Sequence, residues 1–126
     1  MDKKELLLEY LKINIGPILE DILFGSDIED AVILPSNISR DELTGHYEGV
    51  NYVPPKWFDE LKHKKILVID NLDLIDKEEQ IKFIEILKYR KISTFEIDKD
   101  IRIIVTAKNI NKNTINSEIY SLSINI

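Results

Sequence analysis

The residue with the clearest potential for chemistry is Asp70, which directly follows a run of four apolar residues from Ile66 to Ile69. Such a run, apolar at every position, is typical of a central parallel strand that is buried on both faces. In open α/β sheets, ligands bind just outside the carboxyl ends of the strands. Asp70 is therefore either a ligand of a metal ion or phosphate site, or an acidic residue that only forms a turn.

Other polar residues follow Asp70 or the end of a second apolar run. Asp73 and Asp76 would complete an acidic cluster with Asp70, but Asp76 also fits the N-cap of a following helix. Asn109 follows a second apolar run and is either a ligand-binding amide or a turn residue, of which we favour the turn. Because Mg²⁺ is usually held by one or two carboxylates together with substrate phosphates, we expect a structural role for Asp70 unless a nucleotide is brought to it.

Composition disfavours several other classes of site. The chain has no cysteine, which removes disulfides, thiolate metal sites and cysteine nucleophiles. His46 and His63 lack the partners that a zinc site needs, and no nucleophile elbow frames a serine. The formal net charge of −6 disfavours direct binding of nucleic acid, because Lys and Arg must neutralise phosphates there.

Length and hydropathy predict where the protein works. The 126 residues and the 44% hydrophobic content predict one domain, residues 1–126, with a core of its own. No apolar run approaches the roughly 18 to 20 residues of a membrane span. The first residues, Met1 to Glu5, lack the apolar segment of a signal peptide. We therefore expect a cytoplasmic protein without membrane contact.

The elements that would position these residues follow from the apolar patterns. Strands are expected over three apolar runs and one alternating run: 31–34, 65–70, 101–105 and 119–126. Helices are expected over two amphipathic segments: 57–61 and 76–89. Near the N-terminus, helices at 3–11 and 18–23 compete with a strand at 11–15 that leads through Gly16-Pro17 into a single helix. This order predicts an α/β layered domain with a largely parallel sheet.

Three segments in order resemble the AAA+ ATPases, and within them the MoxR-like branch. Ile66 to Asp70 looks like the Walker B strand, and Ile103 to Asn109 looks like the sensor 1 strand with Asn109 at its terminal polar position. Upstream, Asp41-Glu42-Leu43-Thr44-Gly45, followed by Tyr52-Val53-Pro54-Pro55-Lys56-Trp57 and Leu61, is similar to the run that precedes Walker B in MoxR-like proteins. The resemblance covers roughly 31–126. It implies a three-layer αβα, P-loop-NTPase-like fold in which Asp70 helps to hold the magnesium of ATP.

The sequence also departs from that family. None of its four glycines is followed by Lys, so the Walker A loop is absent, and Gly16 would be at most a remnant of it. Asn71 stands where the family has a Glu that polarises the attacking water, and an amide cannot act as a general base. The segment 111–117 lacks the arginine finger, and the helical lid is missing after the last strand.

The resemblance and its departures together predict a truncated, degenerate AAA+ core without hydrolytic activity that serves as a protein-interaction or regulatory module. Its partner would be a copy of itself or an active AAA+ subunit, and no cofactor is expected. A vestigial nucleotide site would comprise Asp70, Asn71, Asn109 and Gly16, with Asp70 as the candidate Mg²⁺ ligand. Two alternatives stay open: nucleotide or anion binding without hydrolysis beside Gly16, and an ATPase completed in trans by a partner.

A second family was weighed on the same residues. Lys65 to Asn71 superficially resembles the first strand of a phospho-receiver domain, and Ile104 to Lys108 resembles its Thr/Ala and Lys positions. The order of the segments argues against this interpretation. The chain between them is too short to hold the strand that would carry the phosphoryl-accepting Asp.

Overall fold

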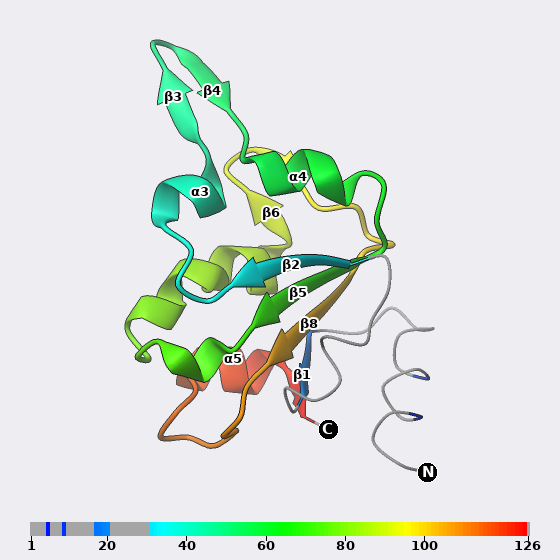
Figure 1. Cartoon of the computed structure of the whole chain (residues 1–126), viewed down its shortest axis with the longest axis vertical. Helices are drawn as coiled ribbons and strands as arrows, with labels where there is room; N and C mark the ends of the chain where they lie inside the picture. Colours follow the sequence, from blue (N-terminus) through cyan, green and yellow to red (C-terminus); the bar gives the residue numbers. More distant parts are fainter. Residues whose placement is uncertain (1–4, 6–8, 10–16, 21–30, 126) are drawn as a thin grey trace.

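A parallel β-sheet forms the centre of the protein (Figure 1), as seen in a computed structural model that describes residues 5, 9, 17–20 and 31–125. Its order is β2-β5-β8-β1-β9, and every neighbouring pair is parallel. The strands are β1 (Ile18–Glu20), β2 (Ala31–Pro35), β5 (Ile66–Asp70), β8 (Arg102–Thr106) and β9 (Ile124–Asn125). The predicted α/β class with a parallel sheet is confirmed, and β5 lies between β2 and β8.

The strand β5 is buried on both faces, as the unbroken apolar run predicted. Leu67 and Ile69 belong to the main hydrophobic core on one face, and Val68, which points to the opposite face, is also fully buried. Val68 lies opposite Ile104 of β8 in the register, and Ile69 lies opposite Val105. Buried parallel strands of this kind bring their carboxyl ends to one edge of the sheet, so Asp70 and the end of β8 meet there.

Short helical segments connect the strands. They are α3 (Arg40–Thr44), α4 (Lys56–Leu61), a 3-10 turn η1 (Leu72–Leu74), a 3-10 segment η2 (Glu79–Phe83), a π-helical segment η3 (Glu85–Tyr89) and α5 (Ser117–Leu122). The predicted helix at 57–61 is confirmed by α4. The predicted cap is confirmed as well, because the Asp76 carboxylate accepts a hydrogen bond of 2.9 Å from the Glu79 amide. The single helix expected at 76–89 is instead divided between η2 and η3.

Two small hairpins complete the fold. One consists of β3 (His46–Glu48) and β4 (Asn51–Val53), and the other of β6 (Lys91–Ile92) and β7 (Phe95–Glu96). The β3–β4 hairpin projects away from the sheet beyond α3 and α4 (Figure 1). The apolar patterns of the sequence predicted no strand in this region.

Two predicted elements were wrong, and one region lies outside the described residues. Residues 18–20 do not belong to a helix but form the strand β1, which pairs with β8 and β9. Residues 117–122 form α5, and the expected edge strand is reduced to β9. The alternatives at 11–16, including Gly16, fall outside the described residues.

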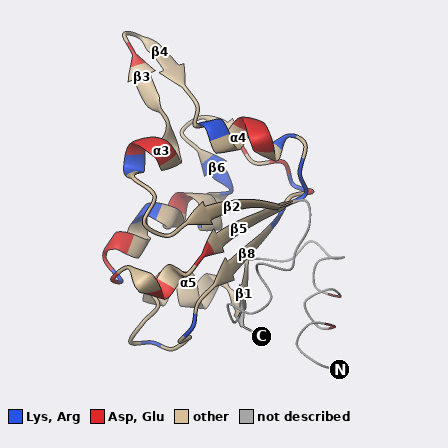
Figure 2. Ribbon diagram, in the orientation of Figure 1, with Lys and Arg blue, Asp and Glu red and all other residues tan. Residues whose placement is uncertain are grey.

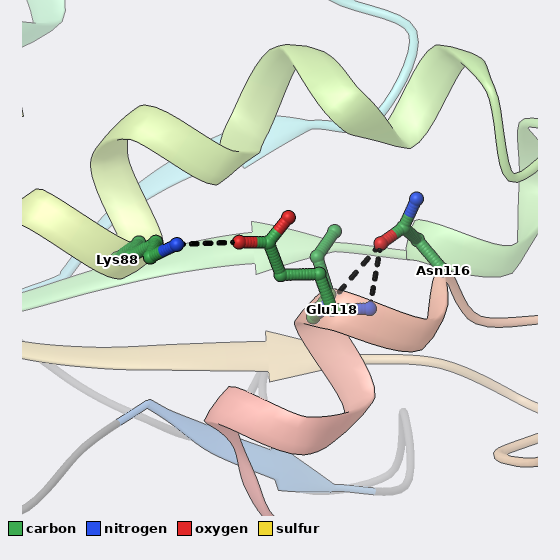
Figure 3. Close-up of polar contacts among 4 residues, drawn as sticks. Lys88, Asn116 and Glu118 are labelled. Carbon is green, nitrogen blue, oxygen red and sulfur yellow. Dashed lines mark hydrogen bonds and ion pairs between the residues drawn. The ribbon is translucent and has the colours of Figure 1, made fainter.

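Polar side chains cap α5 and join it to η3 (Figure 3). The amide oxygen of Asn116 caps α5, because it accepts hydrogen bonds from the amides of Glu118 (2.9 Å) and Ile119 (3.4 Å). The Glu118 carboxylate also pairs with the Lys88 ammonium of η3 at 2.8 Å. This pair raises the pKa of Lys88, through its hydrogen bond to Glu118 and then through the charge of that group.

Gln80 is a fully buried polar side chain that joins two segments of the chain. Its Nε2 donates to the carbonyls of Thr114 (2.8 Å), Ile75 (3.1 Å) and Leu72 (3.3 Å). Its Oε1 accepts a hydrogen bond of 2.7 Å from the Asn116 amide. The side chain therefore holds the segment after β5 against the segment before α5, which fixes the loops around the carboxyl edge of the sheet.

Candidate functional site

The carboxyl edge of the sheet brings Asp70 and Asn71 next to Thr106 at the end of β8. The Thr106 hydroxyl donates a 2.6 Å hydrogen bond to Asp70 Oδ1 and accepts a 2.9 Å bond from the Asn71 amide. Asn71 Nδ2 donates to Asp70 Oδ2 at 3.2 Å. Both carboxylate oxygens of Asp70 therefore carry hydrogen bonds from the protein itself, and Thr106, which is fully buried, cross-links β5 to β8.

Asn71 has a left-handed backbone, with φ of 56° and ψ of 51°. Asn is one of the few residues that adopt this conformation readily, because its short amide tolerates it. The turn directs the chain from β5 into η1, and the Asn71 carbonyl accepts a 3.0 Å hydrogen bond from the Leu74 amide. This local geometry gives the Asn71 position a structural use that does not need a ligand.

Asp73 connects the second predicted amide to the same edge. Its two carboxylate oxygens accept hydrogen bonds from the backbone amides of Lys108 (3.2 Å) and Asn109 (3.0 Å). The Asn109 carbonyl accepts a further bond of 2.5 Å from the Thr114 hydroxyl. Asn109 is exposed in a turn, so the loops after β5 and β8 are joined through Asp73.

A magnesium ion would find few ligands in this arrangement. Asp70 is the acid that ends β5, but its oxygens already bind Thr106 and Asn71, and Asp73 binds backbone amides. Among the described residues, no group of three or more His, Asp or Glu side chains could hold a metal ion. The residues described at this edge do not fit an ATP-bound magnesium, and we derive no chemistry through one.

A cavity of about 360 Å³ lies beside this edge, between the ends of β2 and β5. It is lined by Pro35, Ser36, Asn37, Asp70, Asn71, Leu74 and Ile75. The Ser36 hydroxyl is buried and has no hydrogen-bond partner among the described residues, whereas the Ser36 amide donates to the Asp70 carbonyl at 3.1 Å. No sequence pattern singles out Ser36, because nothing marks a serine after Pro35 as buried.

The β3–β4 hairpin is a second candidate surface. At its tip Val50 is 95% exposed, and Tyr47 on β3 is 67% exposed. The base is held firmly, because the Tyr52 hydroxyl donates to the Thr44 carbonyl and the Tyr52 ring stacks on Phe95 at 5.6 Å. Burial raises the pKa of Tyr52, with smaller contributions from Tyr47 and Glu85. The hairpin therefore presents apolar side chains on an anchored support.

Gly45 allows this hairpin to turn back on α3. Its φ of 81° lies in the left-handed region that favours glycine. A Cβ placed there would lie 2.4 Å from the Val53 carbonyl oxygen and 2.8 Å from the Tyr52 hydroxyl. Beside it, Trp57 is buried and donates from Nε1 to the Leu43 carbonyl at 2.9 Å, so it packs this region against the core.

A groove of about 530 Å³ runs between the outer edge of β2 and the α3, hairpin and α4 region. Its lining includes both Ile33 and Leu34, whose side chains point to opposite faces of the sheet, so the groove follows the edge of the strand. Ile38, Val53, Pro54 and Trp57 add apolar surface. The sequence did not reveal this groove, because it depends on where α4 packs.

Comparisons with known proteins show a likeness at the level of the fold. No family model matches the chain, and no curated protein matches it. A crystal structure of NtrX from Brucella abortus superposes on all of this chain with a TM-score of 0.59 at 17% sequence identity. The chain spans 36% of the length of that protein. At this identity, the likeness shows a shared fold only.

These findings contradict the resemblance to a degenerate AAA+ core of the MoxR-like branch. A similar solved structure is named as NtrX, and neither a family model nor a curated sequence supports the MoxR-like branch. The physical reason is that an apolar run ending in Asp, and a second run ending in polar residues, occur wherever buried parallel strands end at a loop edge. The Walker B and sensor 1 labels are therefore withdrawn. The α/β domain with a parallel sheet remains.

Within the described part of the chain, no helix is both long and apolar enough to cross a membrane.

Proposed function

We propose that this domain is a protein-interaction module without hydrolytic activity. The observation that carries the proposal is the anchored β3–β4 hairpin, which exposes Val50 and Tyr47. Exposed apolar side chains on a rigid support are typical of protein contact sites, where aromatic residues often supply the binding energy. By contrast, the acids at the carboxyl edge are engaged with their own backbone and side-chain neighbours.

The proposal extends to the sheet itself. In the strand order, the connection from β1 to β2 and the connection from β8 to β9 run in opposite directions along the sheet. Such a switch point is where a P-loop-NTPase-like α/β domain would bind its ligand. We keep the finer three-layer, P-loop-NTPase-like description as a proposal on the strength of this strand order. We expect that the chain retains this arrangement as a scaffold and that catalysis is absent.

The test of the proposed function has two arms. A photo-crosslinking amino acid at Tyr47 should give a discrete protein adduct in the cells that make this protein, and the same group at the exposed Lys99 should not. Calorimetric titration with ATP and Mg²⁺ should give no micromolar binding and no turnover. Turnover that is removed by Asp70→Ala, or the absence of any adduct specific to Tyr47, would overturn the proposal.

A second candidate function is binding of a nucleotide or other anion without hydrolysis. The cavity beside Asp70 favours it, because Ser36 places a buried hydroxyl there without a partner among the described residues. The same titration tests this candidate: saturable binding of ATP or phosphate that is weakened by Ser36→Ala, without turnover, would support it. Binding that is unchanged by Ser36→Ala would place the anion elsewhere.

A further inference from the structure

The open edge of β2 has free hydrogen-bonding capacity at Ile33. The Ser36 amide donates to the Asp70 carbonyl at 3.1 Å, so the backbone of Ser36 faces β5. Along a strand, backbone groups face alternate sides, and by this alternation Leu34 also faces β5 whereas Ile33 faces away. Within the described residues, the N–H and C=O of Ile33 have no backbone partner in the β2–β5 pairing or in the surrounding turns.

This edge is accessible and apolar. Ile33 is 49% exposed, although its neighbours Val32 (5%) and Leu34 (2%) are buried. Among the described strands, β2 lies at the end of the sheet, with β5 as its single neighbour. Unpaired edge strands bind extended peptides by adding a strand, in which main-chain hydrogen bonds give affinity and side pockets give specificity.

Charge around the groove selects the kind of peptide. The rim carries the carboxylates of Asp41, Glu42 and Glu60 against the single ammonium of Lys56. The ribbon in Figure 2 is red at acidic residues and blue at basic residues on both α3 and α4, which flank this edge. Since the whole chain also carries a net charge of −6, an approaching basic segment is favoured and an acidic one is repelled.

We propose that the groove beside β2 binds an extended segment of a partner protein in which basic residues alternate with apolar residues. The segment pairs with the outward-facing backbone of Ile33, places its apolar side chains on Ile38, Val53 and Trp57, and directs its basic side chains to the acidic rim. β2 spans five residues, so the paired segment is of comparable length. This inference rests on the proposed interaction function and assigns it a site and a partner chemistry.

A second copy of this chain fits the groove less well. Pairing two β2 edges across a two-fold axis would bring the rim carboxylates of both copies together, because the same surface is used twice. Like charges placed opposite one another cost free energy, and they work against such a dimer. A basic partner segment meets no such penalty.

The experiment uses the full chain and two labelled synthetic peptides of about nine residues, enough to cover a typical strand. One alternates lysine with valine, and its twin alternates glutamate with valine. Fluorescence anisotropy should show saturable binding of the lysine peptide that is at least about tenfold tighter than that of its twin and weaker in high salt. On binding, the Ile33 amide should gain protection from hydrogen exchange.

Two variants and one control separate the backbone from the charge. Ile33→Pro removes the outward N–H but no β2–β5 hydrogen bond, so binding should weaken roughly fivefold. Glu42→Lys combined with Glu60→Lys should weaken it about tenfold. Glu96→Lys changes an exposed acid outside this groove and should leave affinity within about twofold.

Several results would overturn the inference. Equal affinity for the two peptides, no binding of the lysine peptide, or binding without protection of Ile33 would each do so. The exchange measurement on the unaltered chain decides the matter even if Ile33→Pro fails to fold. A concentration-dependent dimer that is lost in Ile33→Pro would assign the edge to a second copy instead. If the lysine peptide does not bind but the crosslinked adduct at Tyr47 still forms, this site is rejected and the proposed interaction function stands.

Discussion

The Thr106→Val substitution tests whether Asp70 is a structural residue of the carboxyl edge. Valine keeps the shape of threonine but removes the hydroxyl that bonds Asp70 Oδ1 at 2.6 Å and the Asn71 amide at 2.9 Å. A hydrogen bond to a charged group contributes about 1.5 to 3 kcal/mol, and a neutral one about 1 kcal/mol. Because Thr106 is fully buried, we expect Thr106→Val to lower the free energy of unfolding by about 3 kcal/mol.

A double-mutant cycle then isolates the pair. Asp70→Ala should cost about 2 kcal/mol alone, since Asp70 is partly exposed and water replaces some of its contacts. If the hydroxyl and the carboxylate are partners, the double variant should lose about 3 kcal/mol and not the sum of about 5 kcal/mol. Urea unfolding followed by circular dichroism measures all four chains with the same slope if the transition is two-state.

The control for the cycle is the exposed Glu78→Ala. Paired with Thr106→Val it should give additive losses within about 0.5 kcal/mol, because the two sites share no partner. Additive losses for the Asp70 pair as well would refute the reasoning, since they would mean that the Thr106 hydroxyl does not engage this carboxylate in solution. Asp70 would then be free to act as a ligand.

Three further substitutions test the supporting structure. Gly45→Ala should lower the free energy of unfolding by about 3 kcal/mol in denaturant unfolding, since the new Cβ would clash with the Val53 carbonyl and the backbone there is left-handed. The control Gly49→Ala also has a positive φ but open space around it, and it should cost only about 1 kcal/mol. Gln80→Met should lower the free energy of unfolding by about 3 kcal/mol, because it leaves three carbonyls and the Asn116 amide without their partner. The midpoint temperature of thermal unfolding should then fall by roughly 10 °C, and a fall of less than about 2 °C would contradict this. Lys88→Met should remove a stabilisation that is present below the unfolded-state pKa of lysine and lost as the pH rises through the raised pKa of Lys88 in the fold. The stabilities of the two chains should therefore converge once the pH exceeds that raised pKa, and a difference that persists there would argue against the Glu118 ion pair.

The sequence predicted the central elements because their signals are local. An unbroken apolar run such as Ile66 to Ile69 leaves one economical structure, a strand covered on both sides, and β5 and β8 follow that rule. Asp76 was predictable as a cap because its bond to the Glu79 amide lies within one turn. Trp57 was predictable as a packing residue because large aromatic side chains in short segments usually find a core.

The elements that were missed depend on distant contacts or on two competing periods. Ile18 and Leu19 fit a helix as well as a strand, and only their pairing with Ile104 and Val105 decides for β1. Tyr120 to Ile126 alternates like an edge strand, but the preceding residues begin a helix, in which Ile119 is fully buried. Asn116 caps this helix by accepting hydrogen bonds from the amides of Glu118 and Ile119, and the helix takes the place of most of the expected strand.

The candidate site was predictable in position but not in use. Sequence placed Asp70, Asn71 and Asn109 at the loop edge of the sheet, and the structure brings Asp70 and Asn71 together there, with Asn109 joined through Asp73. It could not show that Thr106 would engage Asp70, because that contact crosses 36 positions of sequence. Nor could it show the hairpin, whose turn at Gly49 and Val50 carries little hydrophobic signal.

The location of binding follows from where unused capacity remains. At the carboxyl edge, the oxygens of Asp70 and Asp73 accept hydrogen bonds from Thr106 and from backbone amides. A ligand there would have to displace hydrogen bonds that already stabilise the fold. At the side edge, Ile33 offers a donor and an acceptor that the β2–β5 pairing does not use, beside an apolar groove with an acidic rim. Binding at the edge of β2 costs less free energy than binding at the carboxyl edge, because no hydrogen bond within the protein has to be broken there. For this reason we expect recognition to use the outer edge of β2 and the neighbouring hairpin, and the carboxyl edge to serve chiefly as the support that holds β5 in register.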